Sequence, residues 1–144
     1  MGLVTWTAVF RQPAIRDSRE DVAVSLNGLI GAQLQRELRT LLRRRGWDFG
    51  EAVAEDHGWH ALARVEDEGK PLTLSLVTAP ELDAARPDGG AKDGAWRVVI
   101  GLDLGLFAGT KARRMALFRR LAADLDACCR EVGATELVWE VGGP

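Results

Sequence analysis

The chain has 144 residues, of which 47% are hydrophobic and 28% are charged, and its formal net charge at pH 7 is −2. This length and composition are typical of one globular domain and exclude a disordered chain. No apolar run approaches the about 20 residues that a membrane helix needs, and a charge near zero gives no basic field for nucleic acid. Because the N-terminus also lacks a secretory pattern, we expect one cytoplasmic domain over residues 1–144, with neither nucleic-acid nor membrane partners.

The N-terminal third of the sequence predicts a strand and then a helix. Residues 3–10 alternate in the manner of a strand. Residues 17–20, Asp-Ser-Arg-Glu, have the composition of a helix capping box, and the apolar residues after them recur at helical spacing. This predicted helix ends at Gly46, because glycine is the usual residue just beyond a helix C-terminus.

The first half of that predicted helix contains residues that disfavour a helix. Asn27-Gly28 and Gly31 weaken it, since glycine inside a helix costs about 1 kcal/mol relative to alanine. The alternative is a short strand over residues 22–26, with the helix beginning at Asn27.

The rest of the chain predicts more strands and a second helix. A loop is expected over residues 80–94, and another over residues 105–109 leads into a helix from about residue 110 to residue 132. Strands are predicted, from alternation between turn residues, over residues 47–54, 59–65, 71–77, 96–102 and 136–141.

The resulting order is β-α-β-β-β-β-α-β. Short connections imply antiparallel pairing, and two amphipathic helices need one apolar sheet face on which to bury their stripes. We therefore predict an α+β two-layer sandwich with one mainly antiparallel sheet of five or six strands and both helices on one face. The opposite face is left to water or to a partner, and we expect His60, Leu62 and Arg64 there.

The two cysteines, Cys128 and Cys129, are adjacent on the predicted second helix. Consecutive helical side chains point about 100° apart, which disfavours a disulfide between them, and no zinc-type spacing is present. We expect both to be small apolar residues of the helix face.

The most concentrated polar cluster is residues 55–60, Glu-Asp-His-Gly-Trp-His. Carboxylates and imidazoles serve as metal ligands and as acid-base groups, so Asp56, His57 and His60 are the candidates for a metal or catalytic site. The other interpretation is a turn between strands, with Trp59 packed under the hairpin. Neither a nucleophile motif nor a phosphate loop is present, and no cofactor is predicted.

Charge is distributed unevenly along the chain. Residues 36–45 hold five arginines and one glutamate, a local +4, and residues 111–120 hold five basic residues and no acid, a local +5. Residues 47–69 hold seven acids and one arginine, a local −6. The arginines suit the solvated faces of amphipathic helices. The acidic segment is expected to attract a partner, because a field of one sign raises encounter rates with an oppositely charged surface.

The run from Glu55 to Trp59 leading into a strand resembles the E-D-x-G-W segment of a group of small uncharacterised bacterial proteins. The late helix followed by Leu-Val-Trp-Glu at residues 137–140 is similar too. The resemblance covers about half of the chain. It implies a small α+β fold, and because that group carries no assigned activity it implies no catalytic residue.

Our first hypothesis from the sequence is a non-enzymatic protein-interaction domain, such as an immunity-like or accessory factor in a bacterium. Its partner would be another protein or a second copy of the chain. The predicted contact residues are Glu55, Asp56, Trp59, Glu66 and Glu68. The alternatives are a small enzyme or metal-binding protein built on the histidine cluster, and a domain that binds an anionic small molecule between sheet and helices.

Overall fold

The computed structural model describes residues 2–82, 84–103 and 111–144, and within them the chain forms six strands, three α-helices and one 3-10 turn. In chain order these are β1 (Leu3–Arg11), α1 (Arg19–Ala23), α2 (Ala32–Arg44), β2 (Val53–Glu55), β3 (Gly58–Asp67), β4 (Lys70–Pro80), η1 (Lys92–Gly94), β5 (Ala95–Asp103), α3 (Lys111–Glu131) and β6 (Thr135–Val141).

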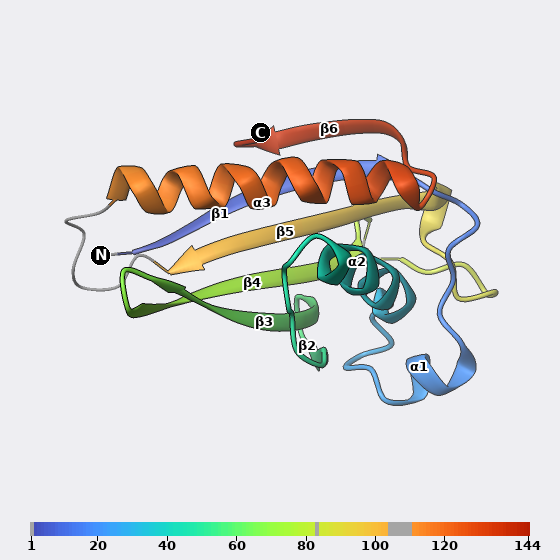
Figure 1. The fold of residues 1–144 in the computed structure, drawn as a ribbon. Coiled ribbons are helices and arrows are strands. Elements are labelled where there is room, and N and C mark those ends of the chain that lie inside the picture. The colour runs from blue at the N-terminus through green and yellow to red at the C-terminus, as the bar shows by residue number, and fades with distance from the viewer. Residues whose placement is uncertain (1, 83, 104–110) are drawn as a thin grey trace.

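The strands make one sheet in the order β2-β3-β4-β5-β1-β6, and every neighbouring pair is antiparallel. The helices α2 and α3 lie side by side on one face of this sheet, the face toward the viewer in Figure 1. The predicted α+β architecture is therefore confirmed. Among the described residues, no helix has both the length and the apolar character that crossing a membrane requires.

The core fills the space between the sheet and the two long helices. On the strands it is built from alternate residues, which include Leu74 and Leu76 of β4 and Trp96 of β5, all fully buried. Leu38 of α2 and Phe118 of α3 meet them from the helix side. Because side chains alternate across a strand, the residues between these core positions point to the opposite face, which we call the outer face.

The predicted continuous helix over residues 17–45 is wrong, because the chain forms two helices separated by residues 24–31. Asn27 and Gly28 adopt positive φ angles of 57° and 70°, which end any regular helix. The alternative is also wrong, since Val22 belongs to α1 and α2 begins at Ala32 rather than at Asn27. The capping box exists, but it joins Ser18 to Asp21 at the start of α1.

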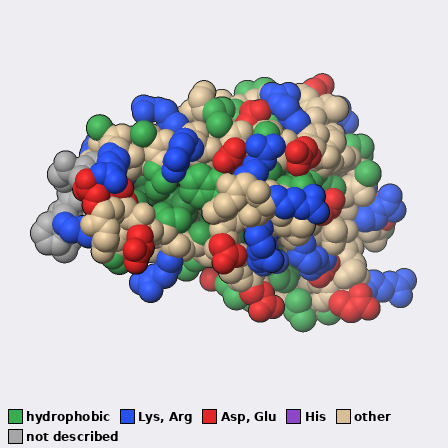
Figure 2. Space-filling view, in the orientation of Figure 1, with side chains coloured by type: hydrophobic (Ala, Val, Ile, Leu, Met, Phe, Trp, Pro, Cys, Tyr) green, Lys and Arg blue, Asp and Glu red, His purple; other side chains and the backbone are tan. Residues whose placement is uncertain are grey.

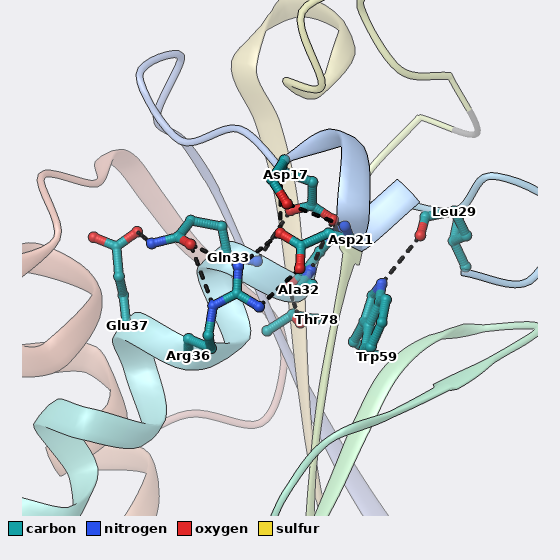
Figure 3. A network of polar contacts seen from close by, with 11 residues as sticks. Asp17, Asp21, Leu29, Ala32, Gln33, Arg36, Glu37, Trp59 and Thr78 are labelled. Carbon is teal, nitrogen blue, oxygen red and sulfur yellow. Dashed lines mark hydrogen bonds and ion pairs between the residues drawn. The ribbon is translucent and has the colours of Figure 1, made fainter. Parts of the chain in front are cut away.

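The N-terminus of α2 is capped by a residue distant in sequence (Figure 3). The buried carboxylate of Asp17 accepts hydrogen bonds from the backbone N–H groups of Gly31 and Ala32 at Oδ2 and of Gln33 at Oδ1, each at 3.0 Å. These N–H groups have no partner within the helix, and the positive end of the helix dipole stabilises the carboxylate. Asp17 thereby replaces the side-chain cap that Gly31, at the N-cap position, cannot provide.

An ion pair joins α1 to α2. The guanidinium of Arg36 donates to Asp21 through two nitrogens, at 2.9 and 2.6 Å, and this contact lowers the pKa of Asp21 from 3.8 to about 2. The short helix is thus fixed beside the start of α2, as Figure 3 shows.

Two side chains fasten α2 to the strands beneath it. Gln35 is fully buried, and its Nε2 donates to the backbone oxygens of Trp59 at 2.7 Å and Leu76 at 3.1 Å. The hydroxyl of Thr78 donates to the oxygen of Gly31 at 2.7 Å. A Cβ atom at Gly31 would come 2.6 Å from the oxygen of Thr78, and φ there is +136°, so only glycine fits this contact.

The predicted strands agree with the structure except at one edge. The strand expected over residues 47–54 is reduced to the three residues of β2, and residues 47–50 instead carry Trp47 and Phe49 into the core outside any strand. Gly46 follows α2 at positive φ, as predicted, and Gly133 follows α3 in the same way. The predicted loop over residues 105–109 and the helix start at residue 110 lie outside the described residues.

The opposite edge strand, β6, is irregular. Its register against β1 shifts twice, between Thr7 and Ala8 and between Val9 and Arg11, and Glu136 has a φ of 54°. Such bulges twist an edge strand and disrupt the row of backbone groups that a further strand would use.

Replacing Asp17 with alanine should lower the free energy of unfolding by about 2 kcal/mol, because three N–H groups lose a charged acceptor in a buried place. Chemical denaturation measures the change. Ser18→Ala, which removes only the cap of the five-residue α1, is the matched control and should cost less. An Asp17→Ala variant as stable as the wild type would contradict this role of Asp17.

Replacing Cys128 and Cys129 with alanine should cost about 1 kcal/mol each, because both thiols are fully buried and unpaired in the core. Burial raises the pKa of Cys128 to about 11 and raises that of Cys129 as well, so neither forms a thiolate at neutral pH. Thiol titration should detect no reactive cysteine before unfolding and two after it. Rapid labelling of the folded chain would contradict the structure.

Candidate interaction surface

The predicted acidic contact residues do not form one patch. Glu55 and Asp56 lie at the β2–β3 turn, whereas Glu66 and Glu68 lie at the β3–β4 turn. The ten residues of β3 separate these turns by about 30 Å. A run that is continuous in sequence is therefore divided between the two ends of a strand.

Arginines also balance part of this acidic charge. Asp67 lies 3.0 Å from Arg113, which also pairs with Glu68, and Asp48 lies 3.4 Å from Arg43. Figure 2 shows the result on the helix side, where Lys and Arg side chains alternate with Asp and Glu. The local field is consequently weaker than the count of residues 47–69 indicates.

Trp59 lies in the core, not on the surface. Its side chain is only 8% exposed, and its indole N–H donates to the backbone oxygen of Leu29 at 3.1 Å. All five tryptophans lie in the described part of the chain, and each is buried or partly buried. They pack on the helix side of the molecule, so the side chain of Trp59 offers no exposed surface for the predicted partner contact.

The histidine cluster comes together only in part. The rings of His57 and His60 are 5.6 Å apart, and His57 Nδ1 lies 3.2 Å from the carboxylate of Asp56. The Nε2 atom of His60 is buried and has no hydrogen-bond partner among the described residues. Within those residues, no three His, Cys, Asp or Glu side chains are placed so that they could hold a metal ion. The geometry gives no support to the metal-binding alternative.

The hollows on the helix side do not favour an anion either. One hollow of about 390 Å³ between α2 and α3 is lined by Arg36, but also by Glu37 and Glu131. A second, of about 450 Å³, lies between the β3–β4 hairpin and α3, and there Arg113 already has two acidic partners. Carboxylates thus face each hollow alongside its cations.

The outer face of the sheet is the surface with the most unusual composition. Its alternation places His60, Leu62 and Arg64 there, on β3, as the sequence predicts. Neither α2 nor α3 covers it. In an antiparallel sheet with one solvated face, the solvated side chains are normally polar. Here the face carries five large apolar side chains that are at least half exposed, Leu3, Val53, Leu62, Val138 and Val141.

The strand register arranges this face in rows of side chains that run across the strands. Two adjacent rows at its centre contain no charged group when the histidine is neutral. We call them row 2 (Leu62, Ser75, Gly101, Thr5) and row 3 (Val53, His60, Val77, Val99, Thr7, Val141). Row 3 crosses all six strands of the described sheet, so the uncharged centre extends over its whole width.

Charged residues flank these two rows. On one side, row 1 holds Arg64 on β3 and Asp103 on β5, which both pair with Thr73. On the other side, row 4 holds Glu55 on β2 and Arg97 on β5. An apolar centre with a polar rim is the usual anatomy of a protein-protein interface.

Comparison of the chain with protein-family models, with curated proteins and with solved structures finds no match in any of the three. The resemblance of residues 55–59 and 137–140 to small bacterial proteins therefore stays a prediction.

Lowering the pH should destabilise the chain through His60. Burial, reinforced by neighbouring His57 and opposed by Glu55, lowers the pKa of His60 below 6.5. As the pH falls from about 7 to about 5, the unfolded chain binds the proton first, so the free energy of unfolding decreases. Denaturation across this range should show a smaller decrease in His60→Gln. Equal pH dependence in the two proteins would contradict the shift.

Proposed function

We propose that this chain is a non-enzymatic protein-interaction domain that binds its partner through the outer face of the sheet. The observation that carries the proposal is the uncharged centre formed by rows 2 and 3, on the face of the sheet opposite to α2 and α3 (Figure 1). Contiguous exposed apolar surface with a polar rim marks interaction sites, because a monomer gains nothing from keeping such surface in water.

Leu62 supports the proposal most directly. Valine and threonine are common in strands whatever the strand faces, because branched side chains suit the extended backbone. Leucine has no such preference, yet Leu62 is 51% exposed on β3, between His60 and Arg64. Burial of this side chain and of Val53 beside it on the face would be favourable by about 1 kcal/mol or more each.

The predicted acidic contact residues belong to the same proposal as part of the polar rim. Glu55 lies in row 4 and Asp56 follows it in the exposed turn, so both border the apolar centre. Glu66 continues β3 beyond Arg64 at the other end, while Glu68 is engaged with Arg113. We propose Glu55, Asp56 and Glu66 as rim contacts.

We further propose that the domain acts in the cytoplasm of a bacterium, as an immunity-like or accessory factor. The unpaired state of Cys128 and Cys129 suits a reducing compartment, where structural disulfides are rare.

A photo-crosslinking phenylalanine analogue at position 62 should form an adduct with a protein in the producing cells, because this position lies at the centre of the proposed contact. The same analogue at Leu26 is the matched control, since Leu26 is a similarly exposed leucine, at 46%, outside the sheet. Mass spectrometry of the adducts identifies what was captured. Adduct formation at position 62 no greater than at position 26 would refute the proposed contact surface.

A further inference from the structure

We propose that the partner of the outer face is a second copy of this chain, related to the first by a two-fold axis that runs across the strands between rows 2 and 3. This inference rests on the proposed function of the same face. It adds the identity of the partner and the way the two faces are aligned.

Four charged residues, in rows 1 and 4, flank the apolar centre. Row 1 presents a cation on β3, Arg64, and an anion on β5, Asp103. Row 4 presents the reverse, an anion beside β3, Glu55 on β2, and a cation on β5, Arg97. The charge pattern of the face therefore inverts when row 1 and row 4 are exchanged.

A two-fold axis in the plane of the interface and perpendicular to the strands makes this exchange. The four central strands, β3, β4, β5 and β1, then lie over their own equivalents in the other copy, and row 1 of one copy faces row 4 of the other. Asp103 faces Arg97, and Arg64 faces the Glu55 side of the β2–β3 pair, one strand spacing of about 4.8 Å to the side. The long arginine side chain covers that offset.

The same axis also exchanges the two uncharged rows. Leu62 of one copy meets the His60 position of the other, and Val77 meets Ser75. The four charges of rows 1 and 4 thus each lie opposite or next to a charge of the other sign, and the apolar side chains of rows 2 and 3 on the four overlapping strands face uncharged ones. Such an isologous contact, in which one patch pairs with itself, is the arrangement found in most dimers.

Charge also favours this axis over a two-fold axis along the strands through the middle of the sheet, between β4 and β5. That axis would keep each row facing itself and reverse the strand order. Asp103 on β5 would then face Thr73 on β4, and Arg64 on β3 would face Leu3 on β1. Both charges would be buried against side chains that cannot balance them, which is unfavourable.

The existing ion pair of Arg97 does not prevent the contact. Arg97 lies 3.7 Å from Glu140, and both side chains are about two-fifths exposed. Such a surface pair contributes little to stability, so Arg97 can reorient toward a facing carboxylate.

The face is large enough for a modest dimer. Four overlapping strands at about 4.8 Å spacing and four rows at about 6.7 Å spacing occupy a flat area of roughly 19 by 27 Å. Side-chain relief makes the accessible area larger than this, which reaches the lower range of specific interfaces, roughly 600 Å² per partner.

The experiment is a charge swap followed by sedimentation and light scattering of the purified chain at low salt. The wild type should form dimers. Arg64→Glu and Glu55→Arg should each weaken dimerisation at least about tenfold, because each places two like-charge contacts in the dimer. A mixture of the two variants should recover dimers close to wild-type affinity, since both contacts again join opposite charges.

Two further variants distinguish an effect at the outer face from a general effect of adding a charge. Leu62→Glu should abolish the dimer, whereas Leu26→Glu should leave it intact, and thermal melting confirms that each variant is folded. Added salt should reduce the effect of the charge swap.

A wild-type chain that stays monomeric up to its solubility limit would overturn this inference. If position 62 still forms adducts with a different protein in that case, the proposed function survives with another partner. Dimers that persist in Leu62→Glu, or a mixture no stronger than its components, would overturn the assigned face or the assigned axis.

Discussion

The carboxylate of Asp17 is the interaction on which the arrangement of this fold depends. It caps α2 from outside the helix and fixes the point at which the helix begins, just after Gly31, which lies against Thr78 at a positive φ and with no room for a side chain. With its start held there, α2 covers β3 and β4, and Gln35 supplies the buried hydrogen bonds between the layers. Since α3 shares the same side, both long helices cover one face of the sheet and neither covers the other. The open outer face is thus a consequence of how the helix layer is anchored.

Much of the fold could be predicted because its signals are local. Alternation identified the strands β3, β4, β5 and β6, and a glycine marked the end of α2. The break between α1 and α2 was missed because apolar residues keep a helical spacing through it, and because the cap that starts α2 comes from a residue 14 positions earlier. The pair Asn27-Gly28 was recognised as unfavourable to a helix, but it was interpreted as a strand-to-helix boundary, whereas its left-handed residues separate two helices. β2 was overestimated because Trp47 and Phe49 alternate like a strand but are buried by packing alone.

The candidate surface was less predictable than the fold. Which side chains of β3 face outward follows from alternation, and His60, Leu62 and Arg64 were expected there. Their neighbours were not, because the position of β5 between β4 and β1 follows from no local pattern. Rows 1 to 4 exist only once that order is known. The acidic segment was expected to act as one contact surface because its residues are close in sequence. In space they are far apart, because the extended strand β3 lies between them.

The irregular edge at β6 has a consequence for assembly. A sheet can grow in two ways, by adding strands at its edge or by stacking through its face. Edge addition is open-ended, because each new copy presents a fresh edge to the next, and it leads toward fibres. The shifted register of β6 and the brevity of β2 obstruct that route at both sides of the sheet. Stacking through the one uncovered face consumes the surface it uses and leaves the helices outside. Of the two routes, the edges of this sheet therefore obstruct the one that leads to an endless polymer, and the route that remains ends at a closed pair.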